Sequence, residues 1–159
     1  PRRGRALGGD TVTADPLRHF EEEHEVALAA LERLEQAGVA LRGSEPPEPH
    51  FAAAREVHGL LCGAVRQHNE DEERALFPML GEDAPLGPFL EEHEILWRLE
   101  TDLGGALDRK DRARAARLAL EIVDLLQTHI RRENDVLFPM ARALLGAEGL
   151  AIVARRLSL

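Results

Sequence analysis

The sequence predicts an all-α protein, an antiparallel up-down-up-down four-helix bundle. Four long segments repeat apolar residues at alternating spacings of three and four, the period of a helix with one face in a core. The segments are separated by short stretches rich in Gly and Pro. No stretch alternates apolar and polar residues as a strand does. Four long helices with short connections are expected to pack as antiparallel neighbours.

Each predicted helix begins and ends at residues that favour such ends. Asp15 is expected to cap the first helix, with Pro16 at its first position. The Pro-rich loop RGSEPPEP ends that helix. Gly146 is the expected C-cap of the fourth helix, and LAIVARRLSL adds a short C-terminal helix. The four main helices are expected over residues 16–41, 50–80, 86–107 and 111–145.

Length, charge and cysteine content restrict the class of protein. With 159 residues, the chain is expected to form one domain over residues 15–159, after a flexible tail at residues 1–14. The net charge of −9 argues against a nucleic-acid partner, because binding phosphates requires a basic face. No uninterrupted apolar run reaches the roughly 20 residues of a membrane span. The single Cys62 excludes an intramolecular disulfide and is typical of a cytoplasmic protein.

Two motifs each occur twice. HNEDEERALFPM, residues 68–79, corresponds to HIRRENDVLFPM, residues 129–140. FEEEHEVALAAL, residues 20–31, corresponds to FLEEHEILWRLE, residues 89–100. The chain therefore consists of two copies of one helical hairpin, each with an FxEEHE helix followed by an HxxxE helix. The His and Glu of HxxxE lie on one helix face, so both can point to the same place.

The core-facing stripe of each helix contains polar residues. The stripe of the fourth helix, for example, is predicted to contain Val136 as well as two polar residues. Counted along the helices, the polar positions fall near one level of the bundle, so they can converge. Buried imidazoles and carboxylates are costly unless they are paired or bound to a metal. The six candidate ligands are His24, His68, Glu72, His93, His129 and Glu133.

Four imidazoles and two carboxylates suit a pair of first-row transition metal ions, with the carboxylates bridging them. The charge balance favours two Fe(II) ions over other choices. Nearby acids are candidate hydrogen-bond partners of the imidazoles: Glu23, Glu25, Glu92 and Glu94. A ferritin-like site needs two ExxH motifs, and the second fails because Leu90 replaces the Glu. No HExxH zinc motif is present.

These motifs resemble the hemerythrin-like, or HHE cation-binding, domains over about residues 15–145. The resemblance implies a non-haem di-iron centre, oxo- or hydroxo-bridged, with the six candidate residues as ligands and Glu72 and Glu133 bridging. Manganese or zinc are the alternatives to iron. Oxygen-carrying hemerythrins have a second His one turn after the third-helix ligand, where this chain has Trp97. Trp97 is therefore expected to lie in the pocket or to shield the centre.

Three further histidines are assigned other places. His58 lies about 15 Å along the helix from His68 and is expected to be a hydrogen-bonded core residue rather than part of a second site. His19 is expected at the surface and His50 in a loop.

Several functions remain open on the sequence. The leading hypothesis is a protein that binds or senses dioxygen or a related small molecule, such as nitric oxide or peroxide, or that handles iron. The alternative is an enzyme-like role, either reduction of peroxide or nitric oxide or supply of iron for iron–sulfur cluster repair. A module that regulates an unidentified partner protein is the least favoured, because residues 15–159 leave no second domain to receive a signal.

Overall fold

The computed structural model describes residues 14–159, and every regular element in this part of the chain is helical. The prediction of an all-α fold is therefore confirmed. The predicted flexible tail falls on residues 1–13, which lie outside the described residues, apart from Ala14.

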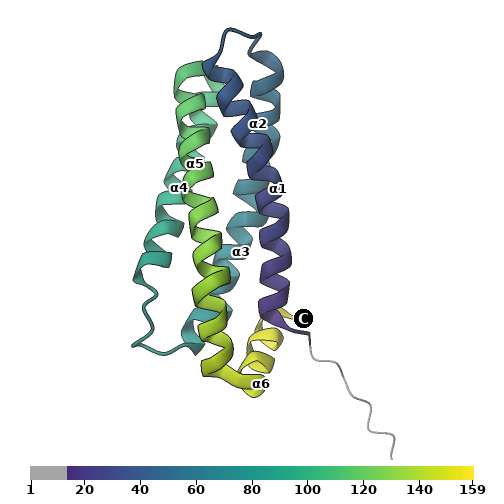
Figure 1. Ribbon diagram of the computed structural model, residues 1–159, viewed down its shortest axis with the longest axis vertical. Coiled ribbons are helices and arrows are strands. Elements are labelled where there is room, and N and C mark those ends of the chain that lie inside the picture. The colour runs from purple at the N-terminus through teal and green to yellow at the C-terminus, as the bar shows by residue number, and fades with distance from the viewer. Residues whose placement is uncertain (1–13) are drawn as a thin grey trace, which may run out of the picture.

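Four long helical segments lie side by side (Figure 1). The loops that connect them alternate between the two ends of the molecule. The first is α1 (Pro16–Arg42) and the third is α4 (Gly87–Asp108). The second consists of α2 (Glu48–Leu60), η1 (Leu61–Val65), α3 (Arg66–Asp71), η2 (Glu72–Leu76) and η3 (Phe77–Met79). The fourth consists of α5 (Arg112–Arg132), η4 (Glu133–Leu137) and α6 (Phe138–Leu157).

The ends of α1 show how the sequence sets the helix boundaries. The Asp15 side chain accepts hydrogen bonds from the backbone N–H groups of Leu17 and Arg18, so it caps α1 as predicted. At the other end, Arg112 donates to the Leu41 carbonyl at 2.7 Å and satisfies a group left free by the helix terminus. The predicted bounds of the long helical segments differ from the observed ones by two residues or fewer, apart from the end of the fourth.

Both LFPM motifs follow a widened helical turn. η2 and η4 are π-helical, and each is followed by a proline, Pro78 or Pro139, six residues after its first residue. A proline lacks the N–H for the normal helical bond, and its ring collides with the carbonyl four residues earlier. Those carbonyls belong to Arg74 and Asp135, inside the two π segments. The wider turn therefore accommodates the proline directly after the HxxxE motif.

The π segment also corrects the predicted core stripe of the fourth helix. Val136 is 59% exposed, whereas Leu137 is fully buried. A π turn contains an extra residue, so the buried face moves on by one position after Glu133. The prediction that Val136 faces the core was therefore wrong, because it assumed an uninterrupted α-helix.

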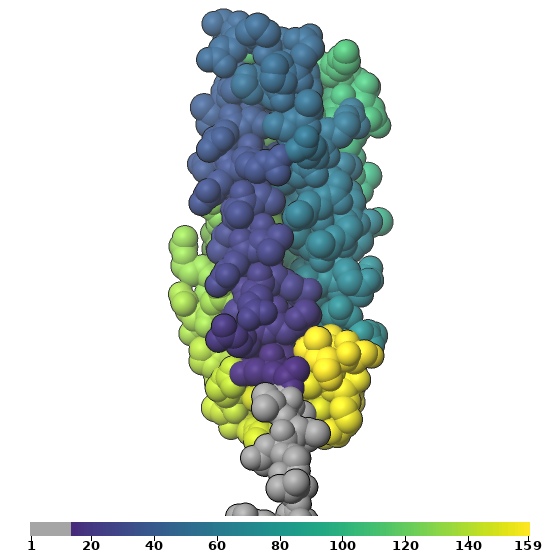
Figure 2. Space-filling view, turned by 90° about the vertical axis from the view of Figure 1, so that its right-hand side faces the viewer, coloured from purple at the N-terminus to yellow at the C-terminus, as the bar shows by residue number. Residues whose placement is uncertain are grey.

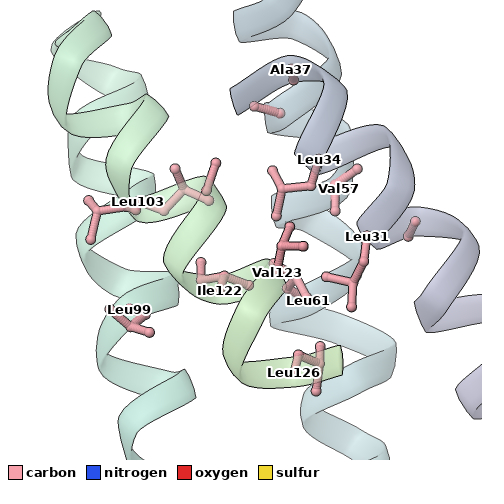
Figure 3. Close-up of a cluster of buried hydrophobic side chains, with 14 of the residues drawn as sticks. Leu31, Leu34, Ala37, Val57, Leu61, Leu99, Leu103, Ile122, Val123 and Leu126 are labelled. Carbon is pink, nitrogen blue, oxygen red and sulfur yellow. The ribbon is translucent and has the colours of Figure 1, made fainter. Parts of the chain in front are cut away.

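Two apolar clusters fill the bundle. One occupies the end of the bundle near the loops that follow α1 and α4, and includes Leu31, Leu34, Leu103 and Ile122 (Figure 3). The other, at the opposite end, includes Phe20 and Leu137 among its buried residues. On every helix the candidate metal ligands lie between residues of these two clusters. The clusters therefore exclude water above and below the candidate site.

The fourth segment changes direction at Gly146, whose φ of 57° and ψ of −169° interrupt α6. Glycine adopts this left-handed conformation without steric cost. The turns that follow pack beside the start of α1, where Val153 joins the same cluster as Leu17 (Figure 2). One stretch within Arg112–Leu157 has the length and composition of a membrane span, a test that core helices also pass. Arg142 and Glu148 interrupt the apolar run there.

Truncating a core residue tests the packing. Leu31 is fully buried, so Leu31→Ala should lower the free energy of unfolding by about 2–5 kcal/mol. Val39 is 57% exposed, and Val39→Ala should stay within about 0.5 kcal/mol of the unsubstituted chain. Urea denaturation of the metal-free proteins measures both values. Equal losses in the two variants would contradict the assigned core.

Candidate metal centre

The structure brings all six predicted ligands together, in two sets of four residues. The first set consists of His24 and His68 with one oxygen of Glu72 and one of Glu133. The two imidazoles approach each other at 3.0 Å between their Nε2 atoms. His24 Nε2 lies 3.0 Å from Glu133 Oε2, and His68 Nε2 lies 3.6 Å from Glu72 Oε1.

The second set repeats this arrangement with the other histidine pair. His93 Nε2 and His129 Nε2 are 3.1 Å apart. Glu72 Oε2 lies 3.6 Å from His93 Nε2, and Glu133 Oε1 lies 2.9 Å from His129 Nε2. Each carboxylate therefore gives one oxygen to each set. In each set the ligand atoms lie within 4.8 Å of one another.

The carboxylate oxygens are what fit this site to metal ions. Glu72 and Glu133 are fully buried, and none of their four oxygens has a hydrogen-bond partner in residues 14–159. Unpartnered buried carboxylates are strongly unfavourable in the absence of a cation. Each imidazole has a hydrogen-bond partner on its outer side, which directs its Nε2 atom inward. Nitrogen and oxygen atoms that could bind two ions are therefore already assembled.

Each imidazole is held by a hydrogen bond from its outer Nδ1 atom. His68 bonds to Glu23 at 2.8 Å and His129 to Glu92 at 2.7 Å. Such outer partners fix the tautomer and the ring orientation of a metal-binding histidine. These two acids were among the predicted partners. The other two, Glu25 and Glu94, form no hydrogen bond to an imidazole in the described part of the chain.

The other two outer partners escaped the sequence analysis. His93 bonds to Glu73 at 2.7 Å and His24 bonds to Asn134 at 2.8 Å. Both partners directly follow one of the two buried glutamates, Glu72 or Glu133, and both lie in a π segment. Their position next to the HxxxE motif was the available signal. On an uninterrupted α-helix both positions lie beside the core-facing stripe, so the spacing alone does not predict them.

The repeated phenylalanines pack against the same four rings. Phe138 stacks on His24 at 5.4 Å between centroids, and Phe77 stacks on His93 at 6.0 Å. Phe20 meets the edge of His68 at 5.1 Å, and Phe89 lies 5.9 Å from His129. Each imidazole thus has one phenylalanine neighbour from the opposite motif type. The Phe of FxEEHE packs on the HxxxE histidine, and the Phe of LFPM packs on the FxEEHE histidine.

In the metal-free protein the site retains protons. Burial opposes a charge on His68, but the carboxylates of Glu72 and Glu23 outweigh it and raise the pKa of His68 to about 10. Burial and the second buried carboxylate raise the pKa of Glu72 to about 8. Burial also resists ionisation of Glu133, yet the imidazoles of His129 and His24, whose Nε2 atoms lie 2.9 Å and 3.0 Å from its oxygens, keep the pKa of Glu133 well below its usual range. One carboxylate is therefore ionised and the other holds a proton near neutral pH.

Two pockets reach the site and differ in character. The first, of about 110 Å³, exposes almost only apolar surface and ends at His24, His68, His129 and Glu133. Apolar side chains from α1, α5 and the second segment line its mouth: Val26, Ala27, Leu60, Ala64, Val65, Leu126 and Ile130. Such a pocket suits a small apolar molecule.

The second pocket, of about 220 Å³, is lined mainly by polar and charged residues and reaches His93. Trp97 lines it and is 56% exposed, so any shielding by its ring acts on this side of the centre alone. Glu100 also lines it. That carboxylate is buried and pairs with Arg66 at 2.7 Å, which accounts for a charged residue in the core stripe of α4.

The remaining histidines lie outside the six-ligand site. His58 is half-buried and bonds to the Glu100 carbonyl at 2.9 Å. His19 is partly exposed and lies 3.4 Å from Glu23, the residue that is hydrogen-bonded to Nδ1 of His68. His50 was expected in a loop but lies in the first turn of α2, which begins two residues earlier than predicted.

Comparison with protein families identifies the chain. The model of the hemerythrin HHE cation-binding domain matches residues 15–155. The chain belongs to the hemerythrin HHE cation-binding family. Comparisons with curated proteins and with solved structures gave no match. The predicted family is therefore confirmed, and the two His/Glu sets of this hemerythrin-like domain could hold metal.

Metal binding should release protons, because the ligands must be deprotonated. At pH 7 the metal-free hemerythrin-like domain holds protons on His68 and Glu72, whose pKa values are about 10 and about 8. Affinity for Zn²⁺ should therefore rise between about pH 6.5 and about pH 8.5, since fewer protons then need displacing. Titration in weak buffer with a pH indicator measures the release. Binding without proton release at pH 7 would contradict the assigned protonation.

Proposed function

We propose that this protein binds two non-haem iron ions within an antiparallel up-down-up-down bundle in the cytoplasm, and that dioxygen or nitric oxide binds there. The observation that carries the proposal is the division of four unpartnered carboxylate oxygens between two imidazole pairs. Imidazole with carboxylate suits a first-row transition metal, and a carboxylate shared by two ligand sets suits a pair of ions.

The roles of the residues follow from their positions. His24 and His68 would hold one ion, His93 and His129 the other, and Glu72 and Glu133 would bridge them. Iron in such a site supplies redox chemistry and an open position for a small ligand. The outer hydrogen bonds keep each Nε2 atom turned inward, and the phenylalanines stop the rings from rotating.

The apolar pocket supports a diatomic ligand over a charged one. A small uncharged molecule can enter past Val26 and Ala64 at little cost in hydrogen bonds, whereas an ion would lose its hydration shell. Reduction of nitric oxide or peroxide is the rival use of the same centre. If the protein is a carrier, the anaerobically reduced form should change its absorption spectrum in air and regain the original spectrum when oxygen is removed. Turnover of the ligand would instead indicate an enzyme.

Removing the charge of either bridging glutamate tests the metal assignment. Protein from iron-supplemented cells should contain about two irons per chain, and Glu72→Gln or Glu133→Gln should lose most of them, because a neutral amide is a poor ligand. Metal analysis by mass spectrometry measures the content. Glu100→Gln is the matched control, since Glu100 is also a buried glutamate but lies outside both ligand sets. Full iron content in both bridging variants would contradict the proposal.

Filling the apolar pocket tests the route of entry. Ala64 is exposed and lines the pocket, so Ala64→Phe should slow binding of nitric oxide to the reduced protein by about tenfold, a barrier of about 1.4 kcal/mol. Its iron content should not change. Ala52→Phe places the same side chain on exposed α2 outside the pocket and should bind at the normal rate. Stopped-flow absorption gives both rates, and equal rates would exclude this route.

A further inference from the structure

The two halves of the site obey an approximate two-fold symmetry. In each FxEEHE motif, the Glu before the His is hydrogen-bonded to the histidine of the following HxxxE motif. These pairs are Glu23 with His68 and Glu92 with His129. The residue after each bridging glutamate holds the FxEEHE histidine of the other hairpin. The same positions therefore do the same work in both hairpins.

One residue breaks this symmetry. The position after Glu72 is Glu73, which holds His93, but the position after Glu133 is Asn134, which holds His24. The two bonds are nearly equal in length, 2.7 Å and 2.8 Å. Three imidazoles thus have a carboxylate partner, and His24 alone among the four has a neutral amide.

The difference changes the ligand rather than its position. A carboxylate that accepts a hydrogen bond from Nδ1 draws the proton outward and makes Nε2 a stronger electron donor. A neutral amide does this less. The set that contains His93 and His129 therefore has two strengthened imidazoles, whereas the set that contains His24 and His68 has one. Loss of an outer partner typically lowers metal affinity by about 10- to 100-fold.

The pockets that reach the two sets also differ, and this difference again makes the set that contains His24 the weaker one. The apolar pocket reaches His24, His68 and Glu133, the residues of the weaker set, together with His129. An ion there would have weaker donors and a direct path for a small molecule. In the other set, both imidazoles have carboxylate partners, and it is reached at His93 by the second pocket, which Trp97 and charged residues line.

We propose that the two metal positions are unequal and that Asn134 sets the difference. The ion between His93 and His129 binds first and tightly, and the ion between His24 and His68 binds second and is the exchangeable one. Asn134 is a positioning residue that acts through His24. This inference rests on the proposed two-metal function and assigns different roles to its two halves.

Stepwise Co(II) binding to the metal-free full chain tests the proposal, with a competing chelator and the cobalt absorption as readout. The unsubstituted protein should bind two ions in steps that differ at least about tenfold in dissociation constant. Asn134→Asp should tighten the weaker step about tenfold, and Glu73→Gln should weaken the stronger step about tenfold. A gain of affinity in the first variant cannot come from structural damage.

Matched variants separate this effect from net charge. Gln67→Glu and Glu70→Gln change charge at exposed positions of α3 that hold no imidazole, so both should leave the two steps unchanged. His68→Ala should remove the weaker step and His129→Ala the stronger one, which assigns each step to its set.

The outcomes that would overturn the inference differ from those that would overturn the proposed function. Two equal steps in the unsubstituted protein, or an Asn134→Asp variant with unchanged steps, would reject the inequality while leaving the two-metal centre intact. Uptake of a single cobalt ion, or of none, would reject the proposed two-metal function itself.

Discussion

The arrangement of this bundle depends on two buried carboxylates, whose charge the surrounding groups must compensate. Glu72 and Glu133 place four oxygens in the centre of the fold, and none has a hydrogen-bond partner within the described residues. Removing an ionised carboxylate from water costs several kcal/mol even after relaxation. Neighbouring carboxylates raise the pKa values of His68 and His129, so these two imidazoles carry the compensating protons in the metal-free protein. All four imidazoles could offer coordinating nitrogens to a metal ion. The apolar clusters on either side keep water out, which makes the need for a cation stronger.

The doubled sequence motifs are the means by which a short chain builds such a centre. One hairpin supplies two histidines and one carboxylate, which is half of the candidate ligands, and the second hairpin supplies the other half. The motifs also supply their own support, since their phenylalanines pack on the imidazoles and their prolines follow the widened turns. The same repetition makes the single departure at Asn134 conspicuous, because every other outer partner of an imidazole is a carboxylate.

The sequence was sufficient for the helices and for the convergence of the six candidate residues, because both depend on periodic spacing that an α-helix preserves. It failed where the helix is not α. η2 and η4 shift the buried face by one residue, so α-helical spacing wrongly predicts a core position for Val136 and does not predict that Glu73 and Asn134 reach the imidazoles. The pairing of Glu100 with Arg66 was also beyond it, because that contact joins two helices through side-chain conformations that spacing does not determine.

We propose that two metal ions lie on either side of the paired carboxylates. A crystal structure of the iron-loaded protein, with anomalous scattering recorded at the iron edge, tests it most directly. The account predicts two peaks, one between His24 and His68 and the other between His93 and His129, with Glu72 and Glu133 contacting both. A single peak, or peaks outside these two ligand sets, would contradict it.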